Sequence, residues 1–160
     1  MSEQAQQPPE GFQPLPEGLG FTDALRPIYR RVMDDRVAMG MFVQSHHCNM
    51  IGICHGGVLM TLSDVGAAAG VNHAREKLGG APTLNLSFDF IAAAREGDWI
   101  MAESDRVELR KRFGFSSGVV TNLEGSVICR YSGTFYMPDH SGYDANIDKF
   151  ARLHGMKPSD

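Results

Sequence analysis

The sequence predicts an α+β fold in which a curved antiparallel sheet wraps around one long helix. The first observation is an almost wholly apolar segment rich in small residues, from about Gly57 to about Lys77, whose composition suits a buried helix. The second is the set of strand-like segments around it, two before and four after, separated by turn signals. One apolar helix followed by consecutive strands favours a sheet that packs on the helix, and no internal repeat is visible.

The predicted elements follow in chain order. Residues 1–20 contain four prolines among Gln, Glu and Gly, too little apolar material for a packed element, and predict a disordered N-terminal arm. Arg26 to Met33 and Arg36 to Gln44 predict a hairpin around the Asp34-Asp35 turn. Gly79-Gly80 ends the helix. The later strands are expected at Thr83 to Ala93, Asp98 to Leu109, Phe113 to Thr121 and Ser126 to Tyr136.

Length and composition are those of one soluble domain. The 160 residues are 42% hydrophobic, and we expect the domain at residues 21–138, followed by a C-terminal extension at 139–160 with the spacing of a short helix. A net charge of −4 without long Lys/Arg runs argues against nucleic acid as the main partner. Three cysteines without metal-ligand spacing predict a reduced, cytoplasmic protein. No hydrophobic run is long enough to cross a membrane or to form a signal peptide.

One carboxylate on the predicted helix needs an explanation. Asp64 has no lysine or arginine three or four residues away, and burying an ionised group without a partner is costly. At the helix start, Gly56 and Gly57 allow a ligand to approach the backbone closely, and the free amide donors there suit a carbonyl oxygen that becomes an oxyanion. The stretch therefore combines an electrophile-activating end with a carboxylate about two turns further on.

These residues carry a family resemblance. An asparagine is followed six residues later by His-Gly-Gly, and an acidic residue follows nine after the histidine. With two later segments, the match covers about residues 26–137 and resembles the hotdog-fold acyl-CoA thioesterases of the phenylacetyl-CoA (PaaI-type) group. The residues that carry it are Asn49, Gly52, His55-Gly56-Gly57, Asp64, Thr83 to Phe90 and Ala94 to Asp98.

The resemblance implies hydrolysis of an acyl-CoA thioester to a free acid and coenzyme A. It implies no metal and no cofactor, with coenzyme A present only as part of the substrate. By position, it assigns the Gly56 backbone amide to polarising the thioester carbonyl and Asp64 to acting as general base or nucleophile. It assigns Asn49 and His55 to orienting the carbonyl or the attacking water, and the Thr83 hydroxyl to placing that water. The candidates for holding substrate are Gly57, Arg95, Lys111 and Arg112.

The resemblance also implies a homo-oligomer, a dimer or a tetramer, with the active site at the dimer interface. Asp64 and Thr83 of one copy would face the loop of the other, and a monomer would be inactive. The chemistry does not depend on the family, because thioester hydrolysis needs a base or a carboxylate nucleophile together with preorganised donors for the oxyanion.

Each candidate has a structural alternative. His55 can hold the turn through its ring nitrogens, Asn49 can be an ordinary turn residue, and Thr83 suits a strand by propensity. The Arg110-Lys111-Arg112 run can be a solvated strand end, and Asp64 can hydrogen-bond a neighbouring backbone group.

Two further motifs invite other chemistry. His46-His47 and Cys48 suggest a metal, but adjacent histidines on an extended segment point to opposite faces, and supporting ligands are missing. Cys54 stands next to His55, but no orienting acid accompanies the pair, and a small buried thiol is the commoner case.

Two other functions remain open on the sequence. A non-catalytic acyl-CoA or fatty-acyl binding module could use the same loop, although it would not need Asp64. A hotdog hydratase or dehydratase would need a histidine and an acid beside the acyl carbon, which the spacing fits less well. The sequence does not determine which acyl group is cleaved, because tunnel length is a tertiary property.

Overall fold

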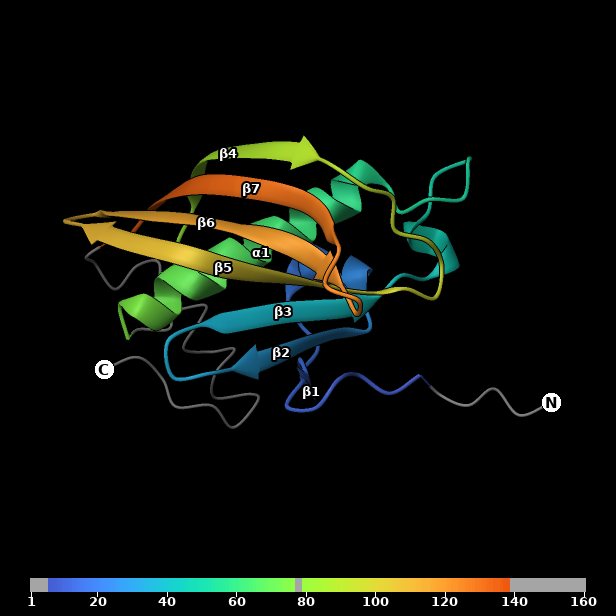
Figure 1. Ribbon diagram of the computed structural model, residues 1–160. Coiled ribbons are helices and arrows are strands. Elements are labelled where there is room, and N and C mark those ends of the chain that lie inside the picture. The colour runs from blue at the N-terminus through green and yellow to red at the C-terminus, as the bar shows by residue number, and fades with distance from the viewer. Residues whose placement is uncertain (1–5, 77–78, 139–160) are drawn as a thin grey trace.

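The computed structural model describes residues 6–76 and 79–138, where one long helix lies on one face of a seven-stranded sheet (Figure 1). The helix, α1, spans Gly56–Ala74. The strands are β1 (Gln13–Pro14), β2 (Ile28–Val32), β3 (Val37–Phe42), β4 (Thr83–Phe90), β5 (Trp99–Arg110), β6 (Phe113–Asn122) and β7 (Val127–Tyr136). They lie in the order β1-β2-β3-β5-β6-β7-β4, all antiparallel, so β4 forms one edge of the sheet.

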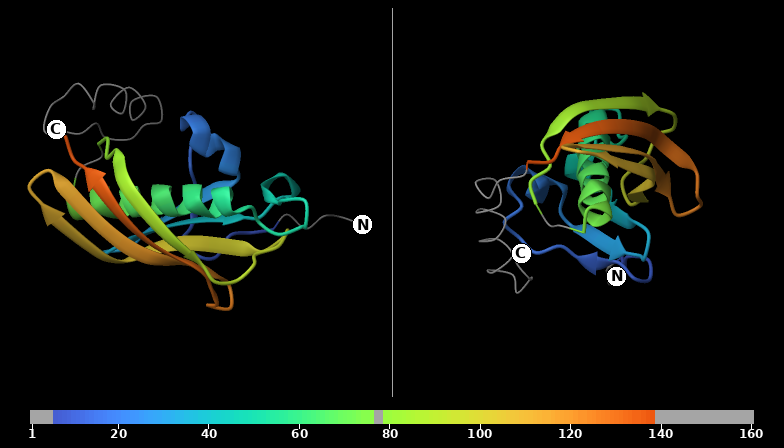
Figure 2. Two further views of the ribbon diagram at one scale, coloured as in Figure 1. Left: turned by 90° about the horizontal axis from the view of Figure 1, so that it is seen from above. Right: turned by 90° about the vertical axis from the view of Figure 1, so that its left-hand side faces the viewer.

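The sheet curves around α1, as the view along the helix in Figure 2 shows. This confirms the predicted arrangement of an antiparallel sheet around a central helix. Apolar side chains of the helix and of the facing strands form one buried core, which removes them from water. Its members include Leu59, Leu62 and Val71 from α1, and Ile100, Val120 and Phe135 from the sheet.

Small residues let the helix approach the sheet closely. A Cβ atom added at Gly66 would lie only 2.9 Å from the Cβ of Ala102 on β5. A Cβ atom at Gly70 would lie 2.9 Å from the Ser104 hydroxyl oxygen on the same strand. The small-residue composition that marks this helix in the sequence is therefore what brings its backbone near β5.

The helix ends earlier than predicted. We expect a helix to Lys77 from the sequence, but α1 ends at Ala74, and Glu76 adopts a left-handed conformation with φ of 54°. A residue with positive φ cannot continue a right-handed helix. Lys77 itself lies outside the described residues.

The N-terminal segment differs from the prediction of a disordered arm. In the described part of that range, Gln13–Pro14 forms β1 and pairs with β2, and Phe12 is buried. The Phe12 ring packs edge-on against Trp99 at 4.9 Å between centroids. Phe12 therefore completes a second, smaller apolar cluster with Trp99, Phe42 and Ala38. Tertiary contacts order this segment despite its low local propensity.

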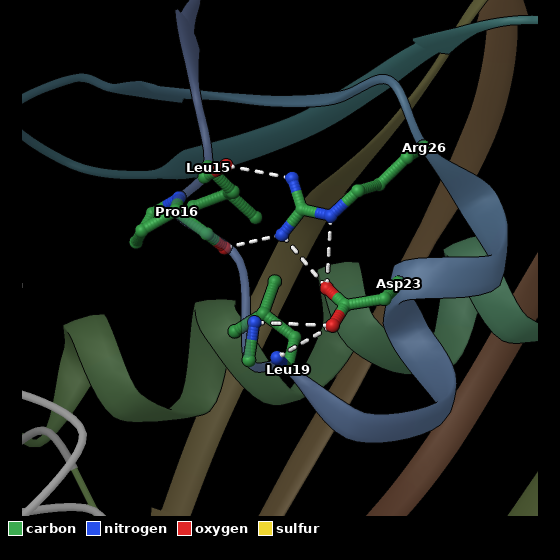
Figure 3. Close-up of polar contacts among 6 residues, drawn as sticks. Leu15, Pro16, Leu19, Asp23 and Arg26 are labelled. Carbon is green, nitrogen blue, oxygen red and sulfur yellow. Dashed lines mark hydrogen bonds and ion pairs between the residues drawn. The ribbon is translucent and has the colours of Figure 1, made fainter.

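A short 3-10 helix, η1 (Gly20–Leu25), follows and is tied back to the chain before it (Figure 3). Arg26 donates hydrogen bonds to the carbonyl oxygens of Leu15 and Pro16 and pairs with Asp23 at 2.7 Å. The second carboxylate oxygen of Asp23 accepts the backbone N–H of Leu19 at 3.2 Å. These bonds close residues 15–26 into a compact turn.

Other differences are local. A second 3-10 turn, η2 (Ser45–His47), replaces the predicted extended segment, and the rings of His46 and His47 lie 4.0 Å apart rather than on opposite faces. The strand expected to reach Ala93 ends at Phe90. The predicted C-terminal helix falls in residues 139–160, outside the described residues. No helix among the described residues is long and apolar enough to cross a membrane.

Candidate active site

The loop before α1 is a small closed turn built around Asn49. The Asn49 side-chain oxygen accepts the backbone N–H groups of Ile51 at 3.1 Å and Ile53 at 3.4 Å. Gly52 has a φ of 77°, which glycine adopts without strain and which lets the chain turn back. Asn49 thus has the turn role that the sequence left open. Its Oδ1 is used by the loop, so only its amide hydrogens remain to donate to a substrate.

His55 is the N-cap residue of α1. Its Nδ1 accepts the backbone N–H of Gly57 at 2.9 Å, which satisfies one of the unpaired donors of a helix start. The Gly57 N–H is therefore not available to a ligand. Gly56 is the first helical residue, so its N–H has no acceptor within the helix and can donate to a bound oxygen. His55 keeps only Nε2 for contact with a substrate.

His47 holds this loop in place through hydrogen bonds to backbone groups of three residues. Its buried ring accepts the Gln44 N–H at Nδ1, so Nε2 carries the proton and donates to the Ala24 carbonyl at 3.2 Å. The His47 carbonyl accepts the N–H of His55 at 2.8 Å. Burial, together with the neighbouring His46, lowers the pKa of His47 below its ordinary value. Both ring nitrogens are occupied by backbone partners, which is a structural role and not that of a metal ligand.

Asp64 and Thr83 are brought together, as the resemblance implies. The Thr83 hydroxyl, at the start of β4, donates to the Asp64 Oδ1 at 2.6 Å. Asp64 is half-buried on α1, and Thr83 is exposed. A short hydrogen bond to a carboxylate oxygen is the stronger, charge-assisted kind, so it fixes the orientation of the Asp64 side chain. One carboxylate oxygen is occupied, and Oδ2 remains for a water or a substrate.

Asp64 and Gly56 of one chain do not meet. They are eight residues apart on α1, which corresponds to about 12 Å along the helix axis at about 1.5 Å per residue. One end of β4 lies beside Asp64, and the other end lies beside Gly56. Thr83 begins the strand beside Asp64, and Phe90 ends it with ring carbons 3.4 Å from where a Cβ atom of Gly56 would lie.

The basic candidates lie far apart. Arg95 forms an isolated β-bridge with Ile53, which places it beside the loop that precedes α1. Lys111 and Arg112 form the turn between β5 and β6, where Lys111 has a φ of 51°. The full length of β5 separates the two groups, about 35 Å for an extended strand of this length. Figure 1 shows the two ends of β5 at opposite ends of the sheet. Because Arg95 precedes β5 and Lys111 and Arg112 follow it, one chain does not bring these three residues together.

Cys54 is a buried thiol, as expected from the sequence. It is 5% exposed, and burial raises its pKa to about 12, so it remains protonated near neutral pH. A nucleophilic role requires a thiolate, which this site does not stabilise. No group of three or more His, Cys, Asp or Glu side chains able to hold a metal occurs among the described residues.

The sequence did not predict the structural roles of two residues in this region. His47 supports the loop and Phe90 packs beside Gly56. His47 lies in a polar loop, and the sequence around it gives little indication that its ring is buried. The contact of Phe90 with the helix start has no local signal, because residues 56 and 90 are far apart in sequence.

Known proteins resemble this chain in sequence and fold. The model of the thioesterase superfamily matches residues 51–129. A protein of Pseudomonas aeruginosa named "Putative esterase" is 34% identical over 131 residues, which cover 81% of this chain and 97% of that protein. The E. coli PaaI protein from the phenylacetic acid degradation operon has a TM-score of 0.65 at 23% identity, covering 73% of this chain and 83% of its own.

A hypothetical thioesterase of Streptococcus pneumoniae, solved with coenzyme A, has a TM-score of 0.63 at 23% identity, covering 69% of this chain and 88% of its own. The structural likenesses establish the fold, and the Pseudomonas relative supports hydrolysis as the general activity. The chain, with its long helix in a curved antiparallel sheet, therefore belongs to the thioesterase superfamily of hotdog proteins.

Proposed function

We propose that the protein hydrolyses acyl-CoA thioesters at a site formed by two copies of the chain. Asp64 of one copy acts as general base or nucleophile, and the Gly56 N–H of the other stabilises the oxyanion. The observation that carries this proposal is the position of β4: its first residue, Thr83, holds Asp64, and its last residue, Phe90, lies beside Gly56.

Pairing of β4 with the β4 strand of a second copy would bring Asp64 of one chain near Gly56 of the other. Two copies of an edge strand related by a two-fold axis run antiparallel, so the start of one lies opposite the end of the other. Thr83 and Asp64 of one copy would then face the Phe90 end of β4 and the Gly56 amide of its partner. A single chain leaves the two groups about 12 Å apart along α1.

The edge has the character of a pairing surface. Leu84, Phe90 and Ile91 are 57%, 55% and 55% exposed, although all three are large and apolar. An exposed apolar edge strand pairs readily with another strand unless charges, prolines or bulges protect it. Asp89 is the only charged residue in β4, and it is held by Arg130 of β7 at 2.8 Å.

The reaction follows from the positions of the polar groups. The Thr83 hydroxyl occupies Asp64 Oδ1, so Oδ2 takes the proton of a water that attacks the thioester carbonyl, or attacks that carbon itself. The carbonyl oxygen becomes negative and is stabilised by the Gly56 N–H. The intermediate collapses and the thiolate leaves. When water is the nucleophile, the thiolate takes up the proton held by Asp64, and a carboxylic acid and a thiol are released. When Asp64 is the nucleophile, the product is an acyl–Asp64 anhydride, which a water then hydrolyses to the carboxylic acid and free Asp64, with the proton of that water passing to the thiolate.

Coenzyme A as the thiol is supported by two features. The structurally similar streptococcal thioesterase was solved with coenzyme A. Arg95 lies beside the loop that precedes Gly56 and offers a guanidinium for a phosphate group near the proposed site. Because Lys111 and Arg112 lie at the other end of β5, Arg95 is the stronger candidate for this contact in the same chain.

The test begins with thiol release from short, medium, long and aromatic acyl-CoA substrates. We expect wild-type protein to hydrolyse at least one of them. We expect Asp64→Asn to lower kcat by about 10²–10⁴-fold, the usual contribution of an acid–base group. Gly56→Pro removes the oxyanion donor and keeps the helix start, because proline fits the first position of a helix and His55 before it is already extended. Its Cβ atom would lie 3.4 Å from the Phe90 ring, an ordinary contact. It should lower kcat by about 10²–10³-fold.

Mixing the two inactive variants tests the shared site. In a mixed dimer, one of the two sites combines the intact Asp64 of one copy with the intact Gly56 of the other. Random mixing should therefore restore about a quarter of wild-type activity in a two-fold dimer. If Asp64 and Gly56 acted within one chain, no activity would return. If wild-type protein binds acyl-CoA but releases no thiol from any substrate, the protein is a binding module.

A further inference from the structure

The two cysteines that enclose the Asn49 loop face each other across a β-bridge. Cys48 and Cys54 are paired in an antiparallel bridge at the base of this loop. The N–H of His55 bonds to the carbonyl of His47 at 2.8 Å, and the N–H of Asn49 bonds to the carbonyl of Ile53 at 2.9 Å. Because these bonds flank the cysteines, Cys48 and Cys54 form a non-hydrogen-bonded pair, the type in which opposite side chains lie closest.

This geometry suits a disulfide bond. Directly opposite residues of a non-hydrogen-bonded pair have Cα atoms about 4.5 Å apart, within the range of about 4.4–6.8 Å that a disulfide spans. Both side chains lie on the same side of the bridge and contact the same apolar core. Both thiols are free in this structure, and each has a backbone carbonyl as its weak acceptor, Gln44 at 3.6 Å for Cys48 and His55 at 3.9 Å for Cys54.

We propose that Cys48 and Cys54 form a reversible disulfide that switches the Asn49 loop between an active and an inactive state. The oxidant is a small-molecule disulfide. The Cys48 thiolate attacks one of its sulfurs and releases a thiol, and Cys54 then attacks the Cys48 sulfur of the mixed disulfide. A second thiol leaves with the Cys54 proton. The two protein sulfurs are oxidised by two electrons, and the small disulfide is reduced to two thiols.

The order of the two steps follows from exposure. Cys48 is half-buried and can be reached from solvent, whereas Cys54 is 5% exposed. Burial raises the pKa of Cys54 to about 12, so it is a poor first nucleophile. Its attack in the second step is intramolecular because Cys54 lies opposite Cys48, and this proximity offsets the small thiolate fraction.

The effect on the site follows from the neighbours of the two cysteines. Asn49 comes directly after Cys48, and His55, which caps α1 beside Gly56, comes directly after Cys54. Joining the sulfurs removes the weak bonds of the two thiols to the carbonyls of Gln44 and His55, so the backbone beside both cysteines must readjust. A displacement of about 1 Å in a catalytic group can cost about 100-fold in rate, so we expect oxidation to lower turnover at least about tenfold. The loss of turnover rests on the proposed function, but the crosslink does not.

The crosslink can be mapped without an activity assay. The full-length protein is incubated with oxidised glutathione, free thiols are alkylated, and the protein is cleaved after methionine with cyanogen bromide. Met50 lies between the cysteines, so Phe42–Met50 and Ile51–Met60 become separate peptides when the thiols are free. We expect them to stay joined after oxidation and to separate on reduction. Amide exchange of residues 49–53 should slow in the oxidised form.

Variants separate the switch from general oxidation damage. Cys48→Ser should keep the basal turnover and lose its sensitivity to oxidised glutathione. The matched control is Cys129→Ala, which removes the remaining cysteine, on β7, and should stay sensitive. Dithiothreitol should restore activity to oxidised wild-type protein, a result that holds even if Cys48→Ser fails to fold. Absence of the joined peptides, or a crosslink that changes neither turnover nor exchange, would overturn the proposal.

Discussion

At the scale of single residues, the candidate site depends on side chains that bond to backbone groups. Asn49, His47 and His55 all use ring or amide atoms to hold the loop that ends at Gly56. Only Asp64 has its partner in another side chain, Thr83. The loop residues that resemble catalytic groups therefore have positioning roles first. Any chemical role uses the atoms that these bonds leave over.

His47 predicts a pH dependence of stability. Its pKa is lowered by burial and by His46, so the folded ring stays neutral below the ordinary value of 6.5. The unfolded chain then binds more protons in that window, and the free energy of unfolding must fall as the pH is lowered from about 7. His47→Asn keeps an acceptor for Gln44 but loses the bond to Ala24, and should cost about 1–3 kcal/mol at neutral pH.

Urea denaturation at a series of pH values measures how the free energy of unfolding of the wild-type protein and of His47→Asn depends on pH. The slope of unfolding free energy against pH between about 7 and 5 should be smaller in His47→Asn than in the wild-type protein, because the variant lacks the titrating ring. Parallel slopes would show that other groups, and not His47, dominate the pH dependence.

At the scale of elements, the packing of α1 on β5 is set by helix glycines. Gly66→Ala gains about 1 kcal/mol of helix propensity but places a Cβ atom 2.9 Å from the Cβ of Ala102. Overpacking of a close core contact costs about 1–3 kcal/mol, so the net effect should be destabilising by about 1 kcal/mol. Thermal or urea unfolding measures it.

A double-mutant cycle gives the control. Ala102→Gly removes the atom that the new Cβ meets, so Gly66→Ala should be less destabilising in that background than in wild type. Strictly additive effects of the two substitutions would mean that the contact between helix and strand relaxes without strain.

At the scale of the whole molecule, the open edge of the sheet is the feature that the proposed function uses. We expect two copies of the 17.5 kDa chain to pair through β4. Ser87→Lys introduces a charge near the middle of this edge. The two-fold operation brings the lysines of two copies close together, where like charges oppose pairing. The variant should be monomeric and inactive.

Ser132→Lys is the matched control. Ser132 is the exposed β7 residue directly opposite Ser87, so the same charge is placed on an interior strand of the sheet. Light scattering after size-exclusion chromatography should show twice the chain mass for the wild type and Ser132→Lys, and the single chain mass for Ser87→Lys. A fully active wild-type monomer would contradict the shared site.

Much of the fold was predictable because it depends on local patterns. Hydrophobic periodicity and the positions of glycine and proline predict the apolar helix, the six main strands and their turns. The predicted ends of these elements agree with the observed ends to within a few residues. The N-terminal segment was not predictable in this way. Its order comes from Phe12 packing on Trp99, a contact between residues far apart in the chain.

The sequence by itself determined which residues are candidates for the chemistry: a lone Asp64 on a helix of small residues and a glycine at its start. Only the tertiary structure decided how they are arranged. It placed Thr83 on Asp64, Phe90 beside Gly56, and Cys48 opposite Cys54. The physical reason is that periodicity records which face of an element is buried. It does not record which distant element covers that face, because that depends on strand order and register.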